Sequence, residues 1–266
     1  MINIHTKALL YNYFMNNFII IILLALIFMY SLFMNFKLIK RYSSNKEYVE
    51  CYKAMNYKDE GCKERIEKFI NETKTDLFKN KARVLLLCCR LDDKQDYGDI
   101  LNELDLRSIF YPKNKFSAKE TDLNSDIFIW LIEAMIKAKK NKDKKLIEGL
   151  YAKFNGCDEL ESYAEFRTVS AVKNALLDKS DIKWFHDLLD GEYTDYKYDK
   201  KLIGIYKRIS SCMCAYFKES IDEYFVSDLG KFKNTMIGAN IMKDLGIYDK
   251  YHDEEDKKED PINSEE

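Results

Sequence analysis

Hydrophobic and polar positions divide the chain into one long apolar run near its start and a series of shorter helical patterns after it. Residues 18–34 contain a single polar side chain, Ser31, and no charged residue occurs at positions 8–36. A helix of about 20 residues is needed to cross the roughly 30 Å hydrocarbon core of a bilayer. Residues 14–36 are therefore predicted to form a single, uncleaved transmembrane helix, preceded by a short N-terminal tail at residues 1–13.

Two alternatives to this anchor are a buried helix of a globular protein and a cleaved export signal. A soluble core helix rarely needs so long an uncharged run. An export signal has a shorter apolar region, of about 7–15 residues, and a cleavage site of small residues. Here the apolar run is followed by "NFKLIKRY". Basic residues flank a membrane span on its cytoplasmic side, so residues 37–48 are predicted to be a basic juxtamembrane segment. The expected location is the cell membrane, with the C-terminal domain in the cytoplasm.

The rest of the chain has the pattern of an all-α domain, predicted over residues 49–248. The whole chain has only two prolines and nine glycines, fewer than a protein of many short strands needs for its turns. Residues 108–124 are expected to be a loop or hinge, and residues 249–266, with nine acidic and three basic side chains, a disordered acidic tail. Helices are expected at residues 45–55, 59–71, 75–91, 125–140, 143–154, 160–177, 180–189, 200–225 and 234–245.

Small residues recur inside the apolar helices, at Cys88, Ala134, Ala175 and Ala215. Each is followed by a polar turn and a second helical pattern. Two-helix units at a period of about 40 residues are typical of an α-solenoid. A helical bundle without repeats explains the same pattern, and the sequence does not decide between the two.

Residues 127–154 are the clearest unit, and they resemble a tetratricopeptide repeat. Trp130 and Ala134 fit the first helix of that repeat and Leu150 fits the second. Leu146 stands where the family has a small residue, no proline ends the unit, and the spacing is longer than the family's. The resemblance covers about residues 80–230. It implies a surface that binds other proteins.

Seven cysteines occur, an odd number at irregular spacing, which does not indicate a disulfide framework. Free thiols suit the reducing cytoplasm. Cys88 and Cys89, and Cys212 and Cys214, invite a metal site, but a C-x-C on a helix directs its thiols to different faces. No second pair of ligands stands nearby, so core packing is expected and no metal site is predicted.

The sequence contains no phosphate-binding glycine motif and no H-E-x-x-H. His186 lies beside Trp184 without a recognisable catalytic partner, so it is expected to be bonded within a helix face. No catalytic residue, cofactor or small-molecule ligand is therefore predicted. Residues 137–145 carry six lysines and one aspartate but no aromatic residue. They are expected to be a solvated turn rather than a nucleic-acid contact.

The stretch "GEYTDYKYDK" places Tyr193, Tyr196 and Tyr198 between charges in an expected interhelical loop. Tyrosine is common in recognition surfaces because its ring is large, rigid and amphipathic. These three residues are the candidate partner-binding site. The alternative is that their rings fold back on the adjacent helices.

The leading hypothesis is a single-pass, membrane-anchored cytoplasmic scaffold whose partners are the lipid bilayer and other proteins. One alternative is a membrane-anchored all-α enzyme that assembles a carboxylate site from distant Asp and Glu residues. Another is a small subunit of a membrane complex.

Overall fold

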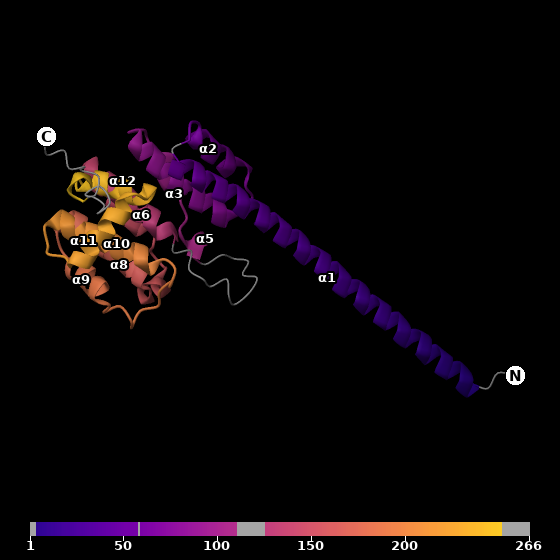
Figure 1. The fold of residues 1–266 in the computed structure, drawn as a ribbon. Helices are drawn as coiled ribbons and strands as arrows, with labels where there is room; N and C mark the ends of the chain where they lie inside the picture. The colour runs from indigo at the N-terminus through magenta and orange to yellow at the C-terminus, as the bar shows by residue number, and fades with distance from the viewer. Residues whose placement is uncertain (1–3, 58, 111–125, 252–266) are drawn as a thin grey trace, which may run out of the picture. The chain divides into compact units, whose positions relative to one another are not determined.

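The computed structural model describes residues 4–57, 59–110 and 126–251, and these are helical almost throughout (Figure 1). Within this part of the chain, β pairing is confined to a parallel bridge between Tyr163 and Lys197. The all-α class expected from the sequence is confirmed. The helices are α1 (Ile4–Tyr57), α2 (Cys62–Glu72), α3 (Asp76–Asp92), α4 (Gly98–Glu103), α5 (Arg107–Phe110), α6 (Asp126–Lys140), α7 (Lys144–Ala152), η2 (Asp158–Ser162), α8 (Ala164–Asp178), α9 (Lys183–Asp190), α10 (Ile203–Phe217), α11 (Glu223–Lys233), α12 (Met236–Asp244) and η3 (Tyr248–Lys250).

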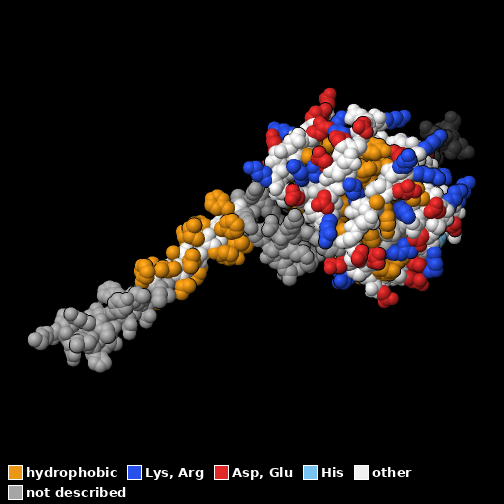
Figure 2. Space-filling model, turned by 180° about the vertical axis from the view of Figure 1, so that it is seen from behind, with side chains coloured by type: hydrophobic (Ala, Val, Ile, Leu, Met, Phe, Trp, Pro, Cys, Tyr) orange, Lys and Arg blue, Asp and Glu red, His pale blue; other side chains and the backbone are white. Residues whose placement is uncertain are grey.

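The prediction of a transmembrane helix at residues 14–36 is wrong. In residues 4–57, 59–110 and 126–251, no helix combines the length and the apolar character that a membrane crossing requires. In the structure the apolar run is not an element of its own. It lies inside α1, which begins before the run and continues through the basic segment at residues 37–48 to Tyr57. Large apolar side chains between Phe18 and Phe36 are exposed on this helix (Figure 2).

The chain divides into two compact units, residues 1–47 and residues 48–266. The first buried side chain of the second unit is Tyr48, and Cys51, Ala54 and Met55 follow it at helical spacing. The last turns of α1 therefore contribute to the core of the second unit. The predicted domain boundaries remain predictions, and the expected acidic tail lies outside the described residues from position 252 onward.

Helix α6 is the centre of the second unit. Ile127–Ile136 are all buried, because α3, α7, α8 and α12 pack around this helix. A helix with one apolar face packs against neighbours on that face only. A helix surrounded by four neighbours needs apolar residues on nearly all of its sides. Trp130 is 1% exposed, and its ring meets Tyr52 of α1 edge to face at 5.4 Å. The apolar pattern of this stretch thus correctly predicted a fully buried helix.

Successive helices of the second unit pack in a regular order. Helix α3 packs on α6, α6 on α8, and α8 on α10, while α7 and α9 each pack between their neighbours in the sequence. Helix α12 departs from this order, since it packs on α6 and α10 as well as on α11. The last α-helix therefore packs on α10, two elements earlier, and on α6, several elements earlier.

The prediction of one continuous helix at residues 200–225 is wrong, because this stretch contains α10 and the start of a second helix, α11. Helix α10 ends at Phe217, where Lys218 takes a left-handed conformation with φ 63°. Helix α11 begins after Asp222, whose carboxylate accepts a hydrogen bond from the backbone N–H of Tyr224 at 2.9 Å. Neither glycine nor proline marks this turn, so a lysine in the left-handed region replaces the usual signal. The expected hinge at residues 108–124 lies mostly outside the described residues.

Candidate functional site

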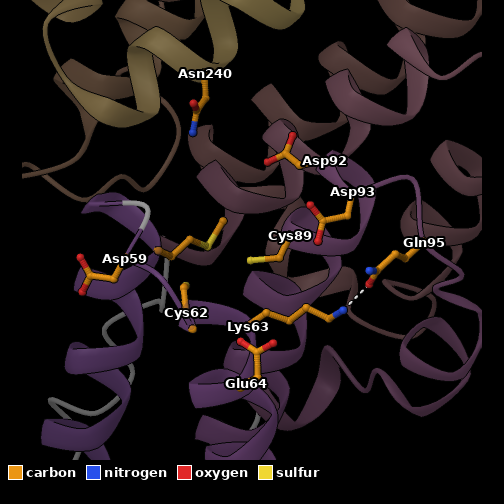
Figure 3. A pocket seen from close by; sticks show the side chains of 11 residues that line it. Asp59, Cys62, Lys63, Glu64, Cys89, Asp92, Asp93, Gln95 and Asn240 are labelled. Atoms are coloured by element: carbon orange, nitrogen blue, oxygen red, sulfur yellow. Dashed lines mark hydrogen bonds between the residues drawn. The ribbon is translucent and has the colours of Figure 1, made fainter.

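A cavity of about 620 Å³ lies in the second unit, where the end of α1, the start of α2, the end of α3 and the side of α12 meet (Figure 3). Its wall carries four carboxylates, those of Asp59, Glu64, Asp92 and Asp93. Lys63 is the basic side chain on the same wall, and its ammonium group donates to the side-chain oxygen of Gln95. The cavity is therefore acidic.

Two turns place these side chains. Gly61 has φ 78°, a left-handed conformation that glycine adopts without strain, and it directly precedes α2. This turn brings Cys62, Lys63 and Glu64 to the cavity after α1 has ended. Helix α3 ends at Asp92, and the backbone N–H of Asp93 caps it by donating to the carbonyl oxygen of Cys89. The two consecutive aspartates thus stand at the end of a helix whose apolar residues form part of the core.

A buried polar network lies behind the wall of the cavity. The ammonium nitrogen of Lys137 lies 2.6 Å from Asp92 Oδ1, 2.9 Å from Asp244 Oδ2 and 3.3 Å from Glu133 Oε1. Asn240 Nδ2 donates to Glu133 Oε1 at 3.4 Å. Asp92 and Asn240 line the cavity as well, so they connect it to the buried charges.

This network corrects the expectation that residues 137–145 form a solvated turn. Only 3% of the whole Lys137 residue is exposed, whereas Lys140 is exposed as expected. Three carboxylates, from α3, from α12 and from Lys137's own helix, surround its ammonium group. Two of these partners, Asp92 and Asp244, are distant in the sequence, so the lysine-rich run by itself does not indicate that its first lysine is buried.

The titration of the network follows from its burial. Burial raises the pKa of Glu133 to about 7, although the charge of Lys137 acts in the opposite direction. For Lys137, burial alone lowers the pKa, but the charges of Glu133 and Asp244 outweigh it and raise the pKa above the usual range. Glu133 Oε2 has no hydrogen-bond partner among the described residues. A carboxyl group that titrates near neutrality therefore lies directly behind the cavity wall.

Two thiols, those of Cys62 and Cys89, complete the cavity wall (Figure 3). Burial, with a smaller effect of the neighbouring Cys62, raises the pKa of Cys89 to about 12. The pKa of Cys62 is also raised, chiefly by burial. Both groups are therefore protonated at neutral pH. All seven cysteines are free thiols in the structure.

The cysteines of α10 lie in the core, as expected, and one of them meets His186. Cys212 and Cys214 are buried, and the sulfur of Cys214 lies 3.8 Å from His186 Nε2. A catalytic cysteine needs a lowered pKa, whereas burial raises the pKa of Cys214 to about 12. This pair therefore lacks the activation of a nucleophile. Within residues 4–57, 59–110 and 126–251, no group of three or more His, Cys, Asp or Glu side chains is placed to hold a metal ion.

The three candidate tyrosines lie together in the loop between α9 and α10, and each is half-buried. The rings of Tyr193 and Tyr198 meet edge to face at 5.1 Å, and Tyr196 meets Trp184 in the same way at 5.1 Å. The ammonium group of Lys207 lies 5.2 Å from the centre of the Tyr193 ring. Part of each ring thus packs on neighbouring side chains, and part remains exposed. Their role in partner binding stays a prediction.

No protein-family model, no curated protein and no solved structure matches this chain. The resemblance to tetratricopeptide repeats therefore rests on the residues and on the packing of the helices alone.

The cavity and its network were not found by sequence reasoning. Their members come from α1, α2, α3, α6 and α12, and they are separated by turns and by whole helices. Glu133 was the one available signal, since it is a charged residue in the middle of the most apolar run of the helical domain. A charge at such a position needs a buried partner, and the search for one leads to Lys137 four residues later.

Proposed function

We propose that the chain is a helical scaffold that binds other proteins, and that the acidic cavity receives a basic side chain of the partner. The observation that carries this proposal is the charge of the cavity wall. Of its four carboxylates, only Asp92 forms an ion pair with another described residue. Asp59, Glu64 and Asp93 remain available to an arginine or lysine of a partner, and such charge-assisted hydrogen bonds are among the stronger polar contacts.

The order of helix packing supports a scaffold with solenoid-like character. Consecutive packing of α3, α6, α8 and α10, with α7 and α9 between them, is what two-helix repeats produce. Such repeats bind partners on the surface that their first helices form. Here α12 packs on α6 and α10 of that row. Helix α12 thus covers part of the surface that the first helices form. We therefore expect a partner to bind beside α12, where Asn240 lines the cavity.

The location of the protein is part of the proposal. Exposed apolar side chains between Phe18 and Phe36 are unfavourable in water and support association with a membrane surface or with other apolar surfaces. Seven free thiols support a reducing compartment such as the cytoplasm. Fractionation of cells followed by extraction of the membranes with alkaline carbonate tests the first point. Alkylation of the protein without prior reduction tests the second.

A charge-reversal experiment tests the partner site. The double variant Glu64→Lys/Asp93→Lys inverts much of the cavity charge. Chemical cross-linking in cells, with quantitative mass spectrometry, should show partners of the unaltered chain that are reduced at least tenfold with this variant, since a desolvated charge contact contributes about 1.5–3 kcal/mol.

The matched control is Glu192→Lys/Asp195→Lys, because both side chains are exposed and lie in the loop away from the cavity. The control should retain the partners. Equal partner sets for all three proteins would remove the cavity from the proposal. Loss with the control alone would move the site to the tyrosine loop.

A second candidate function is an enzyme with a carboxylate site, and the pKa of Glu133 favours it. Carboxyl groups with a pKa near 7 are suited to general acid–base catalysis, and perturbed pKa values cluster at functional sites. Glu133 is completely buried, however, and only its neighbours Asp92 and Asn240 reach the cavity. Structural ion-pair networks also shift pKa values. A substrate-turnover screen in which Glu133→Gln abolishes an activity without lowering stability would favour the enzyme over the scaffold.

A further inference from the structure

Cys62 and Cys89 differ from the other cysteines of the chain in their exposure. Both are half-buried, and both line the acidic cavity (Figure 3). A small reagent dissolved in water therefore reaches these two thiols before any other. The remaining five are buried: Cys51, Cys88, Cys157, Cys212 and Cys214.

The two thiols also share one wall of the cavity (Figure 3). Cys62 is the first residue of α2, and Cys89 lies in the last turn of α3, the helix on which α2 packs. Each side chain also influences the pKa of the other. A disulfide requires its two Cβ atoms to lie about 3.5–4.5 Å apart. Because the two residues line one cavity on two helices that pack together, we expect side-chain rotation to bring the sulfurs within bonding distance.

We propose that Cys62 and Cys89 are a modification site, where a hydroperoxide converts the two thiols to a disulfide that joins α2 to α3 at the cavity wall. The proposal rests on the position of both thiols at one cavity wall, on two helices that pack together, and on their shared access to the cavity. It does not depend on the partner-binding function.

The reaction balances with the peroxide as the oxidant. One sulfur, as thiolate, attacks an oxygen of the peroxide, so that the O–O bond breaks and an S–O bond forms. The products are a sulfenic acid and an alcohol, or water if the oxidant is hydrogen peroxide. The second sulfur then attacks the sulfenic sulfur, the S–S bond forms, and the departing hydroxide takes the thiol proton as water. Two electrons pass from the two sulfurs to the peroxide.

The charge of the cavity selects this class of oxidant. Burial and neighbouring carboxylates disfavour a negative charge at either thiol, as the raised pKa values of Cys62 and Cys89 show. The carboxylates of the cavity wall also repel an anionic oxidant, such as a glutathione-type disulfide. A hydroperoxide is neutral, and the disulfide product carries no charge. Because the attacking species is the thiolate, the reaction is slow at neutral pH and accelerates as the pH rises.

Oxidation of the intact chain tests the proposal. The protein is fully reduced, freed of reductant, treated with hydrogen peroxide at pH 7 and pH 9, then alkylated and digested under non-reducing conditions. We expect a peptide pair joined through Cys62 and Cys89, the loss of two alkylatable thiols per chain, and faster formation at pH 9. Dithiothreitol should release the two peptides.

Three variants make the result specific. Cys62→Ala and Cys89→Ala should each abolish the joined pair, and Cys157→Ala, which removes a buried thiol, should leave it unchanged. Thermal melts of the reduced variants establish that each is folded. The proposal is overturned if no joined pair forms while the chain is folded, if Cys62 or Cys89 pairs with a different cysteine, or if both proceed to sulfinic acids without joining.

Discussion

Lys137 and Asp244 stand 107 residues apart in the sequence, and their side chains meet at 2.9 Å. The contact joins α6, the central helix of the second unit, to α12, its last α-helix. Both side chains are nearly fully buried, with exposed fractions of 4% and 6%. Buried ion pairs are costly to form and more costly to break, because the remaining partner is left as an uncompensated charge. The attachment of α12 therefore depends on a polar contact inside an apolar core.

Replacing the buried lysine should destabilise the domain strongly. Lys137→Met removes the cation shared by Asp92, Asp244 and Glu133. We expect the free energy of unfolding, measured by urea denaturation, to fall by about 3–5 kcal/mol. The control is Lys140→Met, because Lys140 also binds Asp244 but its side chain is 57% exposed. Its loss should be about 1 kcal/mol or less, and equal losses for the two variants would contradict a buried network.

Stability should depend on pH through Glu133. In the folded chain burial raises its pKa to about 7, whereas an unfolded glutamate titrates near about 4.3. Between these values the folded state binds more protons than the unfolded state, so this group makes stability fall as pH rises. Its contribution between about pH 4.5 and pH 7.5 is up to roughly 3 kcal/mol.

The variant Glu133→Gln isolates this contribution, because glutamine does not titrate. Urea denaturation of both proteins between pH 5 and pH 8 should show the variant losing less stability as pH rises. The difference between the two curves should appear mainly between pH 5 and pH 7. Parallel curves would show that Glu133 does not change its protonation in that range.

The sequence predicted the helices well where their signals are local. The stretch at residues 127–136 is apolar on nearly every side, with Glu133 as its one charged residue, and the structure buries all of it. The same local reasoning failed for Lys137, because it lies at the start of a lysine-rich run whose other charged members are exposed or half-buried. Its burial is decided by Asp92 and Asp244, which reach it only through the packing of three helices.

The apolar run in α1 illustrates a second limit of sequence reasoning. Its composition alone suggested a membrane span at residues 14–36, yet the run belongs to a helix that extends to Tyr57. The cavity is a third limit. Met55 and Asn240 line the same space from opposite ends of the domain sequence, and no periodic pattern along a chain reports such a meeting.

Gly238 should not tolerate a side chain. A Cβ atom at this position would lie 2.0 Å from the carbonyl oxygen of Phe232, a backbone atom that cannot move aside without disturbing α11. We expect Gly238→Ala to lower the free energy of unfolding by more than about 2 kcal/mol, as overpacking does. Gly204→Ala is the control, since nothing lies within 4 Å of its added Cβ. Alanine there should leave stability unchanged or raise it by about 0.4–1 kcal/mol.

The second unit should fold without the first, provided that the last turns of α1 remain. A fragment of residues 45–251 keeps Tyr48, Cys51, Ala54 and Met55, all of which are buried. A fragment of residues 59–251 lacks them and exposes the surfaces of Trp130 and Phe78 on which Tyr52 and Tyr48 pack. Burying a large apolar side chain contributes about 1.5–3 kcal/mol, and a domain has only about 5–15 kcal/mol of stability in total. Losing this group should therefore remove most of the stability of the domain.

Circular dichroism and urea denaturation of the two fragments measure this loss of stability. We expect a cooperative helical transition for the longer fragment and a much weaker one, or none, for the shorter. Similar transitions would show that the end of α1 is not part of the core, and a longer fragment that fails to fold would show that the second unit needs residues 1–44.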